Sequence, residues 1–193
     1  MRLNSNKHFR GQSLPAILIA FLITATTLIL GHISFGFWTM LIFSSGFLGG
    51  FVLWLLFPTA TPYAKLRAPY WSALVLFLAH RVEEKVAGFF KFLSEITDVP
   101  TPEVTSWNVI SLVVISAGAW LSIPWLLKRK NELGYYLAWT FFAAMGITEL
   151  AHWAVFPFLV EDTYRYIPGM GSVVLLAPAG WWGLRNLVRG AQA

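Results

Sequence analysis

Long apolar segments recur along the chain at short intervals. Six of them approach or exceed the roughly 20 residues that an α-helix needs to cross the hydrocarbon core of a bilayer, and they occupy residues 14–33, 36–57, 69–93, 107–127, 133–156 and 168–188. Backbone N–H and C=O groups find no water inside a bilayer, so such segments fold as helices. The sequence therefore predicts an all-α fold, a polytopic membrane helix bundle with about six transmembrane helices.

The composition supports this fold class. Hydrophobic residues make up 57% of the 193 residues, charged residues make up 12%, and the mean hydropathy is +0.64. A water-soluble domain could not cover so much apolar surface. No segment resembles an interdomain linker, so we expect a single transmembrane domain over residues 1–193. The chain has no cysteine, which leaves His, Asp and Glu as candidate metal ligands or acid–base groups.

The distribution of charge predicts the orientation of the bundle. With the N-terminus in the cytoplasm, ten of the fourteen basic residues fall on cytoplasmic segments, namely Arg2, Lys7, Arg10, Lys65, Arg67, Lys128, Arg129, Lys130, Arg185 and Arg189. The loop 94–106 and the Glu161-Asp162 pair, which are acidic, then lie outside. The positive-inside rule therefore places both termini in the cytoplasm. The positions of the basic residues matter more here than the net charge of +5, and we expect membrane lipids, not nucleic acid, as partners.

Two strings of ionisable residues interrupt the predicted spans: His80-Arg81-Val82-Glu83-Glu84 and Glu149-Leu150-Ala151-His152. Ionisable groups inside a membrane are costly and are kept mainly where they serve a function. At 100° per residue, His80, Glu83 and Glu84 share an arc of about 100° on one helix, and Glu149 and His152 lie about 60° apart on another. Both strings fall in the outer half of spans that run in the same direction.

These features predict one shared site near the extracytoplasmic side. Glu-x-x-His on one helix facing carboxylates from its neighbours is the pattern of carboxylate metal sites in helix bundles. We expect a divalent transition metal, Zn, Fe or Mn, with the ligands His80, Glu83, Glu84, Glu149 and His152. Glu83, Glu84 and Glu149 are also the candidate catalytic residues. Tyr166 and Glu161, in the loop that follows, are predicted to bind the substrate.

Structural roles for the same residues remain open. Glu83 and Glu84 could pair with Arg81 and Lys85 in an ion network at the outer boundary, with the basic side chains reaching toward water. Glu149 and His152 could form a hydrogen bond that joins two helices. Gly46-x-x-x-Gly50 in the second span permits close helix approach, and we expect it to serve packing within the chain rather than oligomerisation.

The motif order resembles a known family. His80-x-x-Glu83-Glu84, then Glu149-x-x-His152, then Tyr166-x-Pro168-Gly169, looks like the HXXEE family of small bacterial membrane proteins. The resemblance implies a protein integral to the bacterial cytoplasmic (inner) membrane and supports the site, although Thr148 stands where family members often have Asn. A shorter similarity, His80-x-x-x-Glu84 followed by Gly88-Phe89, is to the emopamil-binding sterol isomerases, in which a His and carboxylates move protons beside a lipid without a metal.

Three classes of function fit the sequence. The first is a membrane-embedded metal-dependent enzyme, a hydrolase or oxidoreductase, that acts on a lipid or isoprenoid-like substrate. The second is a metal-free acid–base isomerase of sterol-like or isoprenoid-like lipids. The third is a non-enzymatic metal or proton carrier, or an accessory subunit. The cytoplasmic halves of the other spans offer few polar groups to a transported ion, which favours an enzyme.

The predicted orientation can be tested by cysteine labelling. Because the chain has no cysteine of its own, single cysteines at Ser94 and Asn131 report only those two positions. We expect an impermeant maleimide to label the Ser94 variant in intact cells and the Asn131 variant only after permeabilisation. Labelling of the Asn131 variant alone in intact cells would reverse the assignment.

Overall fold

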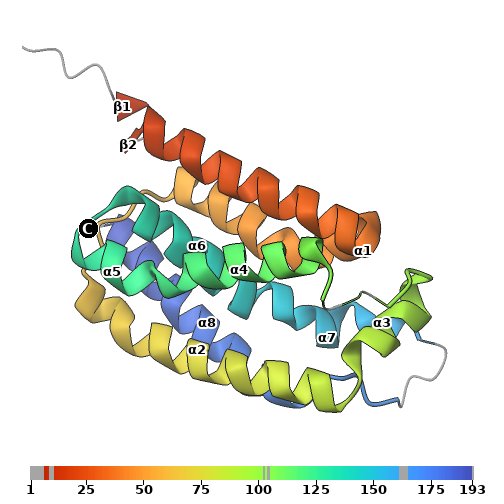
Figure 1. Cartoon of the computed structure of the whole chain (residues 1–193). Helices are drawn as coiled ribbons and strands as arrows, with labels where there is room; N and C mark the ends of the chain where they lie inside the picture. Colours follow the sequence, from red (N-terminus) through yellow and green to blue (C-terminus); the bar gives the residue numbers. More distant parts are fainter. Residues whose placement is uncertain (1–6, 9–10, 102, 104, 161–164, 193) are drawn as a thin grey trace, which may run out of the picture.

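The first two apolar segments form one helical hairpin. In the computed structural model, which describes residues 7–8, 11–101, 103, 105–160 and 165–192, helix α1 spans Leu14–Leu56 but turns back at Gly36. Gly36 has φ 74° and ψ 176°, a conformation essentially restricted to glycine. The ring centroids of Phe21 and Phe51 lie 6.5 Å apart across the hairpin, so its two arms run antiparallel side by side (Figure 1).

After the hairpin, α2, the α4–α5 stretch, the α6 stretch and α8 alternate in direction along the same axis, whereas α3 lies obliquely at one end (Figure 1). Two short strands, β1 and β2, precede the hairpin, and two helical stretches later in the chain are interrupted: α4 continues into α5, and α6 is followed by the short segments η1, α7 and η2. The bounds are β1 Lys7–His8, β2 Gln12–Ser13, α2 Tyr63–Val86, α3 Phe89–Thr97, α4 Trp107–Leu121, α5 Ile123–Lys128, α6 Glu132–Gly146, η1 Thr148–Leu150, α7 Ala151–Ala154, η2 Phe156–Phe158 and α8 Met170–Ala191.

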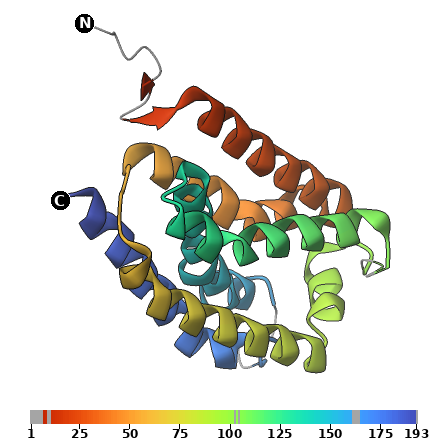
Figure 2. The same ribbon diagram turned by 60° about the vertical axis from the view of Figure 1, so that its left-hand side comes forward.

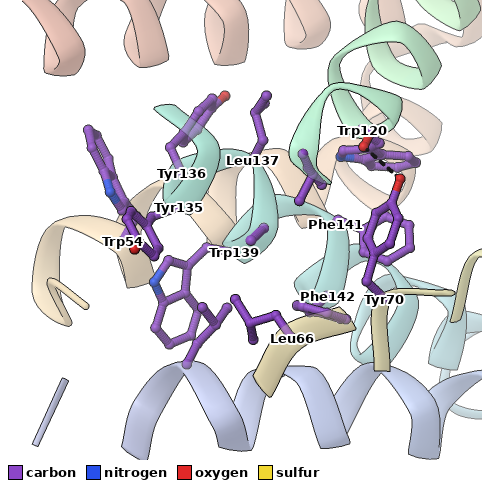
Figure 3. Packing of buried hydrophobic residues seen from close by; sticks show 14 of the residues in the cluster. Trp54, Leu66, Tyr70, Trp120, Tyr135, Tyr136, Leu137, Trp139, Phe141 and Phe142 are labelled. Atoms are coloured by element: carbon purple, nitrogen blue, oxygen red, sulfur yellow. Dashed lines mark hydrogen bonds between the residues drawn. The ribbon is translucent and has the colours of Figure 1, made fainter. Parts of the chain in front are cut away.

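Helix α6 forms the centre of the bundle. Every residue from Gly134 to Gly146 is buried, because α1, α4, α5 and α8 all pack around this helix. Large aromatic side chains such as Trp54, Tyr136 and Trp139 fill the space around it (Figure 3). The Trp120 indole donates to Thr140 Oγ1 at 3.2 Å, and the Tyr70 hydroxyl donates to the Trp120 carbonyl at 3.1 Å. In a bilayer such packing and hydrogen bonds, rather than water exclusion, hold helices together.

The second arm of α1 approaches α6 through small residues. A Cβ built on Gly50 would lie 2.3 Å from Thr140 Cα, and one built on Gly46 would lie 2.6 Å from Ala144 Cα. The backbones of the two helices are therefore too close for any side chain at these positions. The Gly46-x-x-x-Gly50 motif packs inside the chain, as its place in an apolar span predicts.

Among the described residues, three helical stretches are long and apolar enough to cross a membrane: Leu14–Leu56, Trp107–Lys128 and Glu132–Phe158. Helices α2 and α8, with 24 and 22 residues, are also long enough but more polar. Helix α2 contains the first ionisable motif, and α8 contains Arg185 and Arg189. The outer surface of α2 is nevertheless apolar: Val75, Leu78 and Val82 are about 60% exposed. An apolar surface of this kind is expected where a helix faces lipid.

The described ends of the chain lie at one end of the bundle. Strands β1 and β2 and the end of α8 lie at this end, and α3 and α7 lie at the other (Figures 1 and 2). The expected third span, 69–93, begins earlier, at Tyr63, and its helix stops at Val86, because Gly88 adopts a left-handed conformation with φ 74°. The chain then starts a separate helix, α3, which covers this end of the bundle.

The close contact between α1 and α6 predicts a position-specific effect of adding one methyl group. We expect Gly50→Ala to lower the thermal unfolding midpoint, because its Cβ meets backbone atoms that cannot move aside, at a cost of about 1–3 kcal/mol. Gly49→Ala is the matched control, since nothing lies within 4 Å of its Cβ position. Equal midpoints for the two variants, measured in one detergent, would contradict the packing described here.

Candidate metal centre

The first motif lies near the C-terminal end of helix α2 and faces the interior of the bundle. His80 and Glu84 are one turn apart and are 0% and 4% exposed, respectively. Val82 and Val86, on the opposite surface of the helix, are exposed. The helical spacing that places two ionisable groups inward therefore places apolar residues outward, which lets one helix meet both lipid and the site.

The second motif lies where the helix through residues 132–158 is broken. Ile147 leaves helical geometry, with φ −125° and ψ −54°, and η1 and α7 follow. The sequence predicts an uninterrupted span over 133–156, so this break is a departure from expectation. Glu149 and His152 still converge: their Oε2 and Nε2 atoms lie 3.6 Å apart, and the two residues are 7% and 2% exposed.

Four of the predicted ligands meet at one point. His80 Nε2 lies 3.1 Å from Glu149 Oε2 and 3.4 Å from Glu84 Oε1. His152 Nε2 lies 3.3 Å from the same Glu84 oxygen. One ligand atom from each of the four residues lies within 4.8 Å of all the others. The two motifs, 69 residues apart between His80 and Glu149, thus form a single His₂Glu₂ cluster.

Arg81 holds the two carboxylates from the other side. Its Nη1 lies 2.7 Å from Glu84 Oε2, and its Nη2 donates to Glu149 Oε1. Each carboxylate therefore uses one oxygen to pair with Arg81 and points the other toward the two imidazoles. One guanidinium cannot neutralise two carboxylates, so with neutral imidazoles the cluster retains one negative charge. That excess charge favours a bound cation or a protonated His.

Residues at the start of α8 orient the imidazoles. Ser172 Oγ lies 2.8 Å from His80 Nδ1, an arrangement that leaves Nε2 of the ring directed at the cluster, as in many metal-binding His residues. Gly169, with φ 98°, sits so close that an added Cβ would lie 2.6 Å from His152 Cε1 and 2.8 Å from His80 Cε1. Both its backbone conformation and its lack of a side chain are required for the two rings to fit.

Apolar rings enclose the remaining side. The centroids of Phe89 and Phe156 lie 5.1 and 5.2 Å from that of His152, and the two imidazoles are themselves 4.9 Å apart in a T-shaped arrangement. Two buried polar atoms in the cluster make no hydrogen bond to the described residues, Glu84 Oε1 and His152 Nδ1. A buried carboxylate oxygen with no hydrogen bond is costly, and this one points toward both His Nε2 atoms.

Four of the six separations among the ligand atoms are close to those around a small metal ion. Four ligands at about 2.0–2.1 Å from a tetrahedral ion lie about 3.3–3.4 Å from one another. The four N···O separations between the imidazoles and the carboxylates are 3.1, 3.3, 3.4 and 3.6 Å. Two nitrogen and two oxygen donors suit Zn²⁺, Fe²⁺ or Mn²⁺. Four of the five predicted ligands could therefore hold a metal ion, since one ligand atom from each lies within 4.8 Å of the others.

Glu83 lies outside the cluster, although its place in the first motif predicts a ligand. Its carboxylate accepts hydrogen bonds from the backbone N–H groups of Gly171 at 3.0 Å and Ser172 at 2.8 Å, and from the Tyr166 hydroxyl. Glu83 thus caps the N-terminus of α8, where a negative charge is favoured. It holds in place the segment that carries Gly169 and Ser172.

Of the two predicted substrate-binding residues, only Tyr166 is among the described residues. Tyr166 is 56% exposed, and its hydrogen bond to the Glu83 carboxylate raises the pKa of its hydroxyl. Glu161 lies outside the described residues. A cavity of about 320 Å³ lies beside the Glu83–Tyr166 contact, at the end of the bundle that contains the cluster; its lining includes Tyr166 together with Gly88, Lys91, Phe92, Arg165 and Pro168.

Sequence reasoning does not identify Ser172 and Phe156 as parts of the site, and it includes Gly169 and Phe89 only in the motifs that carry the family resemblances. Nothing in the spacing of a lone serine or of two phenylalanines distinguishes them from other residues in apolar segments. Arg81 is expected to pair with a carboxylate at the membrane boundary. It pairs with two, Glu84 and Glu149, both of which belong to the cluster. A Pro-Gly pair before a helix often forms a turn in which the glycine has a positive φ, so the sequence could have indicated this feature of Gly169.

No family model, curated protein or solved structure matches this chain. The described residues contain a buried His₂Glu₂ cluster and long apolar helices, which are consistent with the HXXEE resemblance but do not identify the family.

If the two motifs share one site, their carboxylates must be energetically coupled. We expect Glu84→Gln and Glu149→Gln to affect stability non-additively, by about 1 kcal/mol or more, because both carboxylates pair with Arg81 and face the same imidazoles. A cycle of thermal unfolding midpoints in one detergent, with and without added metal, measures this coupling. The exposed Glu95 supplies the control: Glu95→Gln should be additive with Glu84→Gln. Additive shifts in both cycles would separate the two motifs.

Proposed function

We propose that this chain is a membrane-embedded metal-dependent enzyme that acts on a lipid or isoprenoid-like substrate. The observation that carries the proposal is the buried His80, Glu84, Glu149 and His152 cluster, whose N···O separations of 3.1–3.6 Å suit an ion between them. With neutral imidazoles, the net negative charge of the two carboxylates and Arg81, together with a Glu84 oxygen that has no hydrogen bond among the described residues, supports the same interpretation.

The metal would be held by the two imidazole Nε2 atoms, Glu84 Oε1 and Glu149 Oε2. A bound Zn²⁺, Fe²⁺ or Mn²⁺ ion would supply Lewis acidity, and iron would add redox chemistry. Arg81 pairs with both carboxylates and fixes their orientation. Among the predicted catalytic residues, Glu84 and Glu149 belong to this centre, and Glu83 acts by positioning α8.

The surrounding residues prepare the centre for such an ion. Ser172 orients His80, so that its Nε2 atom faces the two carboxylates. Phe89 and Phe156 keep water away from the side of His152. Exclusion of water strengthens the electrostatic interactions within the centre, because the local dielectric is lower.

An apolar groove supports a lipid-like substrate. A cavity of about 300 Å³ between the second arm of α1 and the broken part of the α6 segment is lined mainly by apolar residues such as Leu41, Ile42, Ile147 and Val155. Thr148, which precedes the ligand Glu149, also lines it. In a bilayer this groove would be open to acyl or isoprenoid chains, so a substrate could approach the site from the side.

The placement in the membrane follows from the apolar helices and the basic residues. We propose that both arms of α1, α2, the α4–α5 segment, the α6 segment and α8 cross the membrane, with both termini cytoplasmic and the metal centre near the extracytoplasmic side. The resemblance to the HXXEE family supports the bacterial cytoplasmic membrane as the location. Tyr166, at the exposed end near the centre, is a candidate contact for the polar part of a substrate.

A second function is favoured by a specific observation. Arg81 pairs with both carboxylates, and each imidazole lies within 3.6 Å of both, so the same contacts can hold protons instead of a metal. A metal-free acid–base isomerase of sterol-like or isoprenoid-like lipids would use such a network. The two functions differ in one measurable property, which is the metal content of the protein.

Metal analysis decides between them. We expect the detergent-purified wild-type chain to contain about one transition-metal ion, and the His80→Ala, His152→Ala double variant to contain almost none, because half of the ligands are lost. His32, which is exposed, gives a matched control, and His32→Ala should keep the wild-type metal content. Equal metal content in all three proteins, or no metal even after incubation with Zn²⁺, Fe²⁺ and Mn²⁺, would rule out the metalloenzyme and favour the isomerase.

A further inference from the structure

Two adjacent cavities lie at the end of the bundle opposite the metal centre. The first, of about 410 Å³, lies between the start of α2 and the end of α8, where Lys65, Asn186 and Arg189 line it. The second, of about 350 Å³, is lined by Tyr63, Leu127, Lys128, Lys130 and Tyr135. Ala60 and Pro62, from the loop before α2, border both cavities. Lys65 precedes His80 by fifteen residues on one helix, which places these cavities about 22 Å from the cluster.

The charge around these cavities is of one sign. Lys65 and Arg189 line the first and Lys128 and Lys130 the second, and no acidic residue among those described lines either. Among the residues that the structure describes, none of these four cations forms an ion pair. Glu132, which begins α6 beside them, already accepts hydrogen bonds from the Ser13 backbone N–H and hydroxyl. The four positive charges are therefore uncompensated within the described part of the chain.

The walls of the first cavity are fixed by hydrogen bonds. The Thr59 and Thr61 hydroxyls lie 2.7 Å apart, and Thr61 also donates to the Asn186 carbonyl at 3.2 Å. The Asn186 side chain in turn donates to the Lys65 carbonyl at 2.8 Å. These contacts join the loop, the start of α2 and the end of α8. The cavity is thus formed by three connected segments, with Lys65 and Arg189 on different walls.

The surroundings point to a lipid as the occupant. Trp71 and Trp182, about two turns deeper on α2 and α8, are 47% and 46% exposed, as expected for indoles at the membrane interface. A phosphate in the cavity would be bound by ammonium and guanidinium groups, and the attached acyl chains would continue along this apolar surface. Basic pockets between helices on the cytoplasmic side of a membrane bind lipid headgroups in this way.

We propose that these cavities bind the phosphate-bearing headgroup of an anionic membrane lipid, with Lys65 and Arg189 as the principal contacts. This site is independent of the metal centre, because the two lie at opposite ends of the bundle. The basic residues at this end would then bind a specific lipid in addition to setting the orientation of the protein in the membrane.

Lipid binding to the full chain tests the proposal. Native mass spectrometry of the detergent-solubilised protein, titrated with phosphatidylglycerol or phosphatidylcholine, measures the affinity for each lipid. We expect phosphatidylglycerol to bind about tenfold more tightly than phosphatidylcholine, and the Lys65→Gln, Arg189→Gln variant to lose about tenfold in phosphatidylglycerol affinity. Inorganic phosphate at millimolar concentration should not displace the lipid.

The matched control removes the same charge elsewhere at the same end. Arg67 and Arg185 lie on α2 and α8, are exposed, and line neither cavity. We expect Arg67→Gln, Arg185→Gln to weaken phosphatidylglycerol binding by less than about twofold. Circular dichroism and the unfolding midpoint should show that both double variants remain folded. Equal losses in the two variants, no preference for phosphatidylglycerol, or displacement by inorganic phosphate would overturn the proposal.

Discussion

Two carboxylates buried beside a single guanidinium determine much of how one end of the bundle is organised. Glu84 and Glu149 come from different helical segments, and each gives one oxygen to Arg81 and turns the other toward the imidazoles of His80 and His152. An ionised carboxylate in a medium of low dielectric is stable only when it is paired and hydrogen-bonded. The cluster therefore holds α2 and the broken α6 segment at one separation. The position of the start of α8 is fixed as well, because its residues pack against the imidazoles.

The two surfaces of α2 meet different environments, which lets the protein accommodate this polar centre. One surface of the helix presents His80 and Glu84 to the cluster, while Val75, Leu78 and Val82 on the other surface are exposed. The exposed surface is as apolar as that of a lipid-facing helix, whereas the inward surface carries the ionisable groups of the candidate site. This division explains why α2 is too polar overall to resemble a membrane span by composition, although its exposed surface suits lipid.

The two ends of the bundle have opposite chemistry. The end with α3 and α7 contains the His₂Glu₂ cluster with its two buried carboxylates. The end with both described chain termini carries Lys65, Lys128, Lys130 and Arg189, which form no ion pair with the described residues. In a membrane, basic residues at one end favour one orientation, and buried ionisable groups at the other mark a functional site. Glu83 connects the site to the rest of the fold, because it caps α8, the helix whose far end forms the basic cavity.

The sequence by itself determined the fold class, the apolar segments and the two ionisable motifs, because hydropathy and helical spacing are local properties. It also indicated that the two motifs belong together, since ionisable groups in apolar segments need compensation for their burial. Only the tertiary structure decided that Glu83 faces the N-terminus of α8 and that Ser172, Gly169, Phe89 and Phe156 complete the centre. Glu83 and Glu84 are adjacent and chemically identical, and about 100° of helical rotation directs them to different partners. Which partner each one meets depends on how distant segments pack, and that information is absent from the local pattern.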